Sequence, residues 1–209
     1  MKRFFCLILS LAFAACAFGQ TAEEIVARMD ENMAQYDEKD GVSLVMDIKM
    51  PIIGTFSTKA YTRGDKTRME MSKAGAEFIV WKDGDTEYTY DVTKKEIEIK
   101  NSSPAKDSSD GGDVEMFNGI TEGYDVSIKK ETPTAWYITC KKSRSNTEKD
   151  DPKTMDLVVA KGTYEALSLS VKKSGITITL RDLKYGVTEK QVTFNPADYP
   201  DATIIDKRQ

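Results

Sequence analysis

The chain contains no histidine. This absence excludes catalysis by Ser-His-Asp or Cys-His arrangements, zinc sites with histidine ligands and pH switches based on imidazole. Cysteine is also scarce: it occurs only at Cys6, Cys16 and Cys140. The first two lie in an apolar N-terminal segment, and without that segment a single thiol remains, which cannot form an internal disulfide. The fold must therefore be stabilised by burial of apolar side chains.

The chain also lacks an excess of basic residues, because its formal net charge is −4. Nucleic acid is therefore not expected as a partner. The glycines are scattered among turns and form no phosphate-binding loop. Asp107, Asp110 and Asp113 lie among turn-forming residues without the spacing of an EF-hand. We predict that the protein is not an enzyme, with no catalytic residues, no cofactor and no metal.

Long apolar runs are absent outside the first 19 residues. Lys2 and Arg3 precede an apolar stretch, and the sequence AFG forms a small-x-small cleavage site before Gln20. This order is typical of a secretory signal peptide and predicts a single periplasmic domain at residues 20–209. The alternative is acylation of Cys16, because the preceding Phe13-Ala14-Ala15 resembles a lipobox. Cys16 would then anchor the protein to a membrane.

The mature chain is predicted to begin with one helix and to continue almost entirely as strands. Thr21 and Glu24 fit a capping box, and apolar residues recur every three or four positions from Ala22 to Tyr36, which predicts about four helical turns. Period-two alternation follows, with turns between short segments, which predicts antiparallel hairpins. The expected strands are 42–50, 55–62, 67–72, 77–81, 87–91, 96–100, 124–130, 136–142, 154–160, 166–173, 176–184 and 191–194.

A polar segment at 101–113 and a short helix at 114–121 interrupt these strands. The helix carries Met116 and Phe117 on one side. It is either part of a plain surface loop or a mobile lid whose apolar side closes over a cavity. The fold class is therefore mostly β with a few helices (α+β). We expect a single strongly curved antiparallel sheet of about 11 strands, covered by the N-terminal helix and the short lid helix.

The most unusual feature of the composition is its set of methionines together with several aromatic side chains. Methionine suits surfaces that must fit irregular partners, and aromatic rings add amphipathic contact area. Cys140 alternates with Trp136 and Ile138 and is expected in the core. We predict a hydrophobic ligand-binding cavity between the first helix, the first strand and an aromatic hairpin. Its residues are Met29, Met33, Met46, Ile48, Met50, Trp81, Tyr88, Tyr90, Met116 and Phe117.

Several segments in this order resemble the LolA-like family of periplasmic carriers of outer-membrane lipoproteins. They are AYTRGDKTRMEM (60–71), FIVWKDGDTEYTYDVTKKEIEI (78–99), ALSLSVKKSGITITLRDLKYG (166–186) and VTFNPADYPDATIID (192–206). The resemblance covers essentially all of the mature chain. It implies an open half-barrel whose cavity shields acyl chains. The implied partners are an acylated lipoprotein or lipid, an inner-membrane releasing complex and an outer-membrane acceptor. We expect a monomer, and the alternative function is an envelope sensor or structural lipid-binding protein.

The resemblance also assigns a role to Arg68, which matches the family's strand arginine. That role is lid gating, with Arg68 pointing inward and bonded to the closing loop near residues 113–121. Strand alternation alone places Arg68 outward beside Glu70, in an exposed ion pair, because Met69 and Met71 occupy the other face. A bulge at Gly64-Asp65 would shift the register by one residue and reconcile the two interpretations.

Overall fold

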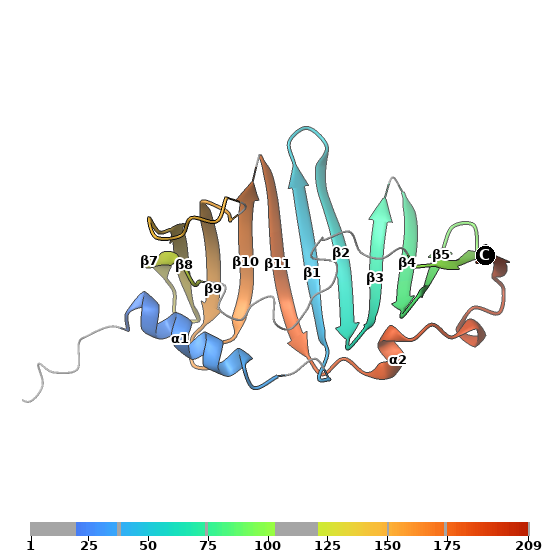
Figure 1. The fold of residues 1–209 in the computed structure, drawn as a ribbon, viewed down its shortest axis with the longest axis horizontal. Coiled ribbons are helices and arrows are strands. Elements are labelled where there is room, and N and C mark those ends of the chain that lie inside the picture. The colour runs from blue at the N-terminus through green and yellow to red at the C-terminus, as the bar shows by residue number, and fades with distance from the viewer. Residues whose placement is uncertain are drawn as a thin grey trace, which may run out of the picture.

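The computed structural model describes residues 20–36, 39–73, 75–102, 121–149, 151–173 and 175–208. One open twelve-stranded sheet dominates it, in the order β12-β6-β5-β4-β3-β2-β1-β11-β10-β9-β8-β7 (Figure 1). The strands are β1 Val42–Met50, β2 Gly54–Arg63, β3 Lys66–Lys73, β4 Ala76–Asp83, β5 Thr86–Asp91, β6 Glu96–Asn101, β7 Tyr124–Glu131, β8 Ala135–Lys142, β9 Thr154–Ala160, β10 Ala166–Lys173, β11 Ile176–Tyr185 and β12 Thr203–Asp206.

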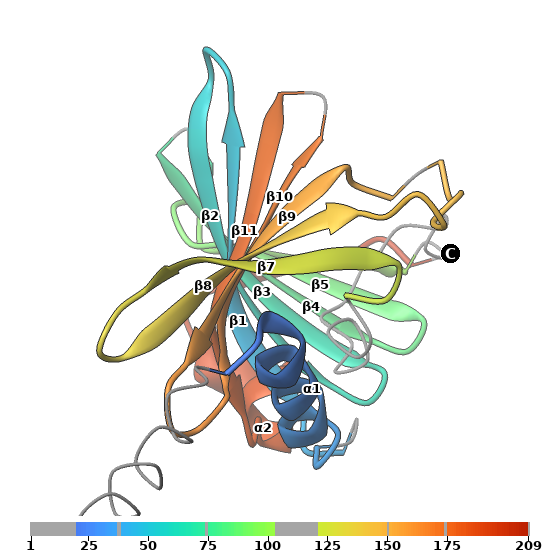
Figure 2. The same ribbon diagram turned by 90° about the vertical axis from the view of Figure 1, so that its left-hand side faces the viewer.

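The predicted fold class is confirmed: the chain is mostly β, with a few helices and one open sheet. Sequential hairpins build each side of the sheet, and β1 pairs with β11 to join the two sides. The strands twist strongly, so that those at one end of the sheet cross those at the other (Figure 2). One pair departs from the antiparallel expectation, because β12 runs parallel to β6.

Helix α1, Ala22–Met33, begins at the predicted capping box. Thr21 accepts a hydrogen bond from the Glu24 N–H, and the Glu24 side chain accepts one from the Thr21 N–H. Both bonds satisfy amide groups that have no partner within the first turn. The helix is shorter than predicted and ends before Tyr36, whose ring stacks on Tyr185 with centroids 3.7 Å apart.

Residues 191–194 do not form the predicted last strand. Thr188 and Gln191 make a second capping box, and residues Glu189–Val192 form the short helix α2. The 3-10 helix η2, Pro196–Asp198, follows and leads to β12. We call residues 187–208 the C-terminal arm.

The two faces of the sheet follow from the strand register, because directly paired residues share a face and successive residues alternate. Met46 pairs with Leu180 on β11 and with Thr58 on β2. The same row continues through Met71 to Phe78. We call this side the helix face, because the side chains that pack against α1 belong to it. The side that carries Trp81, three residues after Phe78, is the arm face.

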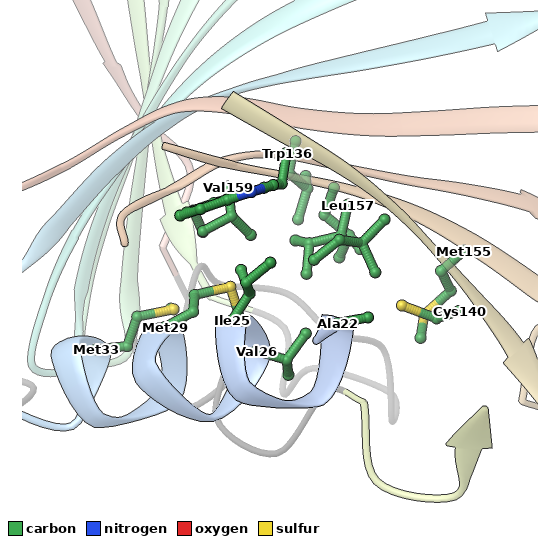
Figure 3. Close-up of a cluster of buried hydrophobic side chains, with 14 of the residues drawn as sticks. Ala22, Ile25, Val26, Met29, Met33, Trp136, Cys140, Met155, Leu157 and Val159 are labelled. Atoms are coloured by element: carbon green, nitrogen blue, oxygen red, sulfur yellow. The ribbon is translucent and has the colours of Figure 1, made fainter. Parts of the chain in front are cut away.

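Helix α1 covers the helix face at one end of the sheet. Its apolar stripe forms one cluster with side chains of β8, β9 and β10, and the close-up shows the labelled side chains of α1, β8 and β9 pointing toward one another (Figure 3). The core cluster also reaches Leu44 and Ala60 on the central strands. The residues of α1 in it are Ala22, Ile25, Val26, Met29 and Met33, and their main partners are Trp136, Ile138, Cys140, Met155, Leu157, Val159, Ala166, Leu169 and Leu180.

The C-terminal arm covers the arm face at the opposite end. Trp81 is 2% exposed and lies edge-on to Phe194 and Tyr199, with ring centroids 5.3 and 5.6 Å away. Tyr88 stacks on Phe194, and Tyr90 contacts Tyr199. Glu189 of α2 forms an ion pair with Lys66 on β3. The sheet therefore has one cover on each face, at opposite ends.

Candidate functional site

An apolar surface remains on the helix face of the central strands. Ile48 pairs with Ile178 on β11, and Met69 pairs with Val80 on β4. These side chains are half-buried, except Ile178, which is 39% exposed, whereas the core beneath α1 is nearly inaccessible. We call this set the methionine surface. It consists of Met46, Ile48, Met69, Met71, Phe78, Val80 and Ile178.

The methionine surface is continuous with the core and ends at β5. Met46 and Met69 pack against the cluster that contains α1. Beyond β4 the helix face becomes polar: Glu87 on β5 forms an ion pair with Lys100 at 2.9 Å, and Glu98 on β6 pairs with Lys207 at 2.6 Å. Charged side chains thus limit the apolar area to the middle of the sheet.

A cavity of about 580 Å³ lies on the same face, at the end of α1. Its apolar lining includes Met33, Tyr36, Leu183 and Tyr185. Burial raises the pKa of the Tyr185 hydroxyl to about 12, so this group stays protonated and neutral at physiological pH. The volume falls within the range of small-molecule sites in proteins.

The structure divides the predicted cavity residues into two groups on opposite faces. Met29 and Met33 lie on the helix face, where they are 0% and 2% exposed and belong to the core. Met46, Ile48 and Met50 follow them on that face and are half-buried. The first strand and the first helix therefore share an apolar side, as the sequence indicates.

The aromatic hairpin is on the other side of the sheet, which corrects the prediction. Tyr88 pairs with Trp81, and Tyr90 lies two residues further along β5, so all three rings occupy the arm face. They pack against the C-terminal arm. The odd spacing between Phe78 and Trp81 puts them on opposite faces. No single cavity can contain both Met46 and Trp81. Met116 and Phe117 lie outside the described residues, and the lid they would form stays a prediction.

Arg68 also lies on the arm face, opposite Met69 and Met71. Its guanidinium group is 5.5 Å from the ring centroids of both Tyr61 and Trp81, and it forms an ion pair with Glu70 at 2.6 Å. The ion pair is the one that strand alternation predicts, although its side chains are only 24% and 30% exposed. Residues 113–120, which the gating role requires, are outside the described part of the chain.

The bulge that would shift the register is absent from β2 and β3. Arg63 pairs with Lys66 and Tyr61 with Arg68 without a break. Gly64 and Asp65 form a plain two-residue turn, with Gly64 at φ +56°, a conformation that glycine adopts without strain. The register therefore keeps Arg68 on the arm face.

The arm face carries a charged groove that the sequence analysis did not identify. It has a volume of about 440 Å³, and its lining includes Val45, Lys59, Glu70, Ile79 and Arg181. The Nε of Arg181 donates a hydrogen bond to Asp47 at 2.7 Å. This bond and one from Ser57 lower the pKa of Asp47. Opposite charges at alternate strand positions are the signal that could have revealed the groove.

Among the described residues, Cys140 is the one free cysteine. Cys140 is fully buried, and its burial raises the pKa of the thiol to about 11, which keeps it out of the reactive thiolate form. Its predicted place in the core is confirmed. Among the residues that the structure covers, there is no group of three or more potential metal ligands. In the same part of the chain, no helix has the length and apolar character needed to cross a membrane.

The sequence matches no family model and no curated protein. Solved structures are similar in fold. LprF from Mycobacterium bovis has a TM-score of 0.49 at 11% identity, over 85% of this chain and 99% of that chain. The lipoprotein LppX from Mycobacterium tuberculosis has a TM-score of 0.48 at 10% identity, over 78% of this chain and 96% of the other.

A LolA superfamily protein from Nitrosomonas europaea is also among the similar structures, with a TM-score of 0.30 at 12% identity over 86% of this chain and all of that protein. All three likenesses are distant, so a function for this chain must rest on its own surfaces.

Proposed function

We propose that the protein is an exported, non-catalytic carrier that binds the acyl chains of lipids or lipoproteins on its methionine surface and shields them from water. The observation that carries the proposal is the uncovered apolar area on the helix face of the central strands, of which Ile178 is 39% exposed. A fully folded sheet gains no stability from leaving such side chains half-exposed, so a bound apolar ligand explains them.

The energetics favour an acyl chain as the ligand. Each methylene group removed from water contributes about 0.8 kcal/mol, so apolar contact alone gives substantial affinity. Thioether side chains adapt their shape at little energetic cost and accept chains of different lengths. The cavity beside Met33 and Leu183 lies on the same face and offers space for part of such a chain.

Export supports this function. The predicted signal peptide would direct the mature domain, residues 20–209, to the periplasm, where an acyl chain that moves between the inner and outer membranes must cross water. An inner-membrane releasing complex would supply the cargo and an outer-membrane acceptor would receive it. The lid predicted around Met116 and Phe117 would close over the bound chain, and opening it would permit release.

A pair of neighbouring substitutions on β11 tests acyl binding. Ile178→Asp places a charge on the helix face, and the matched control Thr177→Asp places the same charge on the arm face. We expect Ile178→Asp to weaken binding of a fluorescent fatty-acid probe by at least about tenfold, because a carboxylate strongly opposes apolar contact. The control should bind like the unmodified protein.

The fold of both variants is checked by circular dichroism and thermal unfolding. Ile178 is exposed enough that the charge can remain hydrated in the free protein, so the variant should fold. Equal probe affinities for a folded Ile178→Asp variant and its control would contradict the proposal. Extraction of the protein purified from cells, followed by mass spectrometry, then identifies the class of the natural cargo.

A further inference from the structure

The turn between β1 and β2 exposes two neighbouring isoleucines. Ile52 is 106% exposed and Ile53 is 65% exposed, the highest values among the large apolar side chains that the structure describes. This hairpin belongs to the central strands and projects beyond the neighbouring hairpins, at the edge of the sheet where the strand ends point away from α1 (Figure 1). Single exposed apolar residues are ordinary, but two adjacent ones at a projecting tip form a small exposed apolar patch.

The backbone of the tip is strained in a way that a hairpin does not require. Ile52 has φ +74°, and the Ile53 N–H donates a hydrogen bond to the Pro51 carbonyl at 2.9 Å. This is a tight three-residue turn in a conformation that a β-branched residue rarely adopts. Glycine would fit there without strain, so closing the turn does not explain the isoleucine. Strain of this kind is concentrated at functional sites.

Three lysines lie near the tip, on its β10–β11 side. Thr177 on β11 pairs with Lys49 on one side and Lys172 on the other, which places both lysines in one row across three strands. Lys173 is exposed next to them. The β10–β11 turn lies close to the tip: a Cβ atom added to Gly175 would be 3.6 Å from the Pro51 ring. The segments 48–56 and 170–179 contain no carboxylate, although the whole chain has a net charge of −4.

We propose that this tip docks the protein on an anionic lipid surface. Ile52 and Ile53 enter the boundary between headgroups and acyl chains, while Lys49, Lys172 and Lys173 contact the anionic headgroups. A local positive charge in an otherwise acidic protein gives attraction to the membrane together with a defined orientation. The tip is convex and only three residues long, which suits insertion into a deformable bilayer better than a protein interface, whose core is broad and closely packed.

Docking in this orientation also presents the methionine surface to the membrane. Half-buried Met50 and Ile176 lie between the tip and the Ile48–Ile178 pair on the helix face, and half-buried Phe56 extends that pair onto β2. An apolar path therefore runs from the tip into the candidate acyl site. The docking itself does not depend on acyl binding, because it uses different side chains.

Sedimentation with lipid vesicles tests the proposal on the mature protein. The protein should bind vesicles of phosphatidylcholine and phosphatidylglycerol more tightly than vesicles of phosphatidylcholine alone, and added salt should weaken the binding. The double variant Ile52→Ser and Ile53→Ser should bind the anionic vesicles at least about tenfold more weakly, given the apolar area removed. The matched control is Ile204→Ser with Ile205→Ser, a second pair of exposed isoleucines on the edge strand β12.

Charge reversal tests the lysines separately. Lys49→Glu with Lys172→Glu should abolish the preference for anionic vesicles, whereas Lys141→Glu with Lys153→Glu, at exposed positions elsewhere, should largely keep it. Ile52→Gly provides a variant that should fold at least as well as the unmodified protein, because it relieves the left-handed isoleucine. It should still bind anionic vesicles more weakly.

Two results would overturn the proposal. One is undiminished vesicle binding by the folded Ile52→Ser and Ile53→Ser variant. The other is that the unmodified protein ignores anionic vesicles but forms dimers that this variant cannot form, which would assign the tip to contacts between copies of the chain. Binding of the fluorescent acyl probe is measured in parallel. If the tip variants lose vesicle binding and keep probe binding, docking and acyl binding are separate properties.

Discussion

The two ends of the sheet are covered on opposite faces and by different means. At the β7–β10 end, α1 contributes five buried side chains to a core on the helix face that consists of aliphatic and sulfur-containing residues and Trp136. At the β3–β6 end, the C-terminal arm places a four-residue helix and a 3-10 turn on the arm face, and it then joins the edge of the sheet as the short strand β12. Its contacts are aromatic stacks around Trp81 and an ion pair between Lys66 and Glu189.

This difference shows how one sheet can have two covers and still leave a binding surface. If both covers lay on the helix face, the arm would cover the apolar side chains that β3 and β4 carry there. Because the arm lies on the opposite face, the helix face of β1, β3, β4 and β11 keeps its apolar residues accessible. The comparison also implies that the α1 end carries most of the stability and that the arm end opens more easily.

The largest effect is expected at the α1 end. Met29 is fully buried in the core cluster, so Met29→Ala should lower the free energy of unfolding by about 2–5 kcal/mol. Met46→Ala is the matched control, and it should cost distinctly less because Met46 is only half-buried. Denaturant titration monitored by circular dichroism measures both. Equal losses would mean that the two methionines are equally important for folding, which would contradict the division between core and binding surface.

A smaller and more local effect is expected at the arm end. Phe194 contacts Trp81, Tyr88 and Tyr199, and Phe194→Ala removes these ring contacts at a cost of about 1–3 kcal/mol. Hydrogen exchange should then become faster in the C-terminal arm while α1 keeps its protection. If exchange accelerates equally in α1, the two ends unfold as one unit and the comparison fails.

The smallest effect concerns the stability of the fold at acidic pH, and it arises at the central pair β1–β11 that joins the two ends of the sheet. Hydrogen bonds from Arg181 and Ser57 lower the pKa of Asp47 in the folded protein. Its contribution is therefore present above the ordinary carboxyl pKa and is lost as the pH falls through the lowered folded value. Asp47→Asn should remove this part of the acid destabilisation and leave the α1 core unchanged. Unfolding titrations from neutral to acidic pH measure it, and an unchanged profile would assign the acid sensitivity to other carboxyl groups.

The sequence predicts most of the strands because a period of two and intervening turns are local signals. It also predicts α1, whose capping box and apolar stripe agree. The alternation of residues 191–194 wrongly predicts a strand, because the contact between Thr188 and Gln191 favours the short helix that ends at Val192. The parallel pairing of β12 depends on where the arm ends in space, which no local pattern encodes.

The candidate site was predicted in part for the same reason. Alternation along β1 correctly groups Met46 with Ile48 and Met50. It cannot tell whether they share a face with Trp81, because that depends on an unbroken register across three hairpins. The sequence from Pro51 to Gly54 indicates only a turn, and the structure shows that both of its isoleucines face the solvent.

The division of the sheet also supplies a natural pair of spectroscopic reporters. The chain has only two tryptophans, and each is a sheet residue buried beneath one of the two covers. Trp136 lies in the α1 cluster beside Tyr164, and Trp81 lies under the arm beside Phe194. Replacing either indole by phenylalanine leaves a protein whose fluorescence reports on the other end alone. The opening of each cover can therefore be followed separately without adding a label.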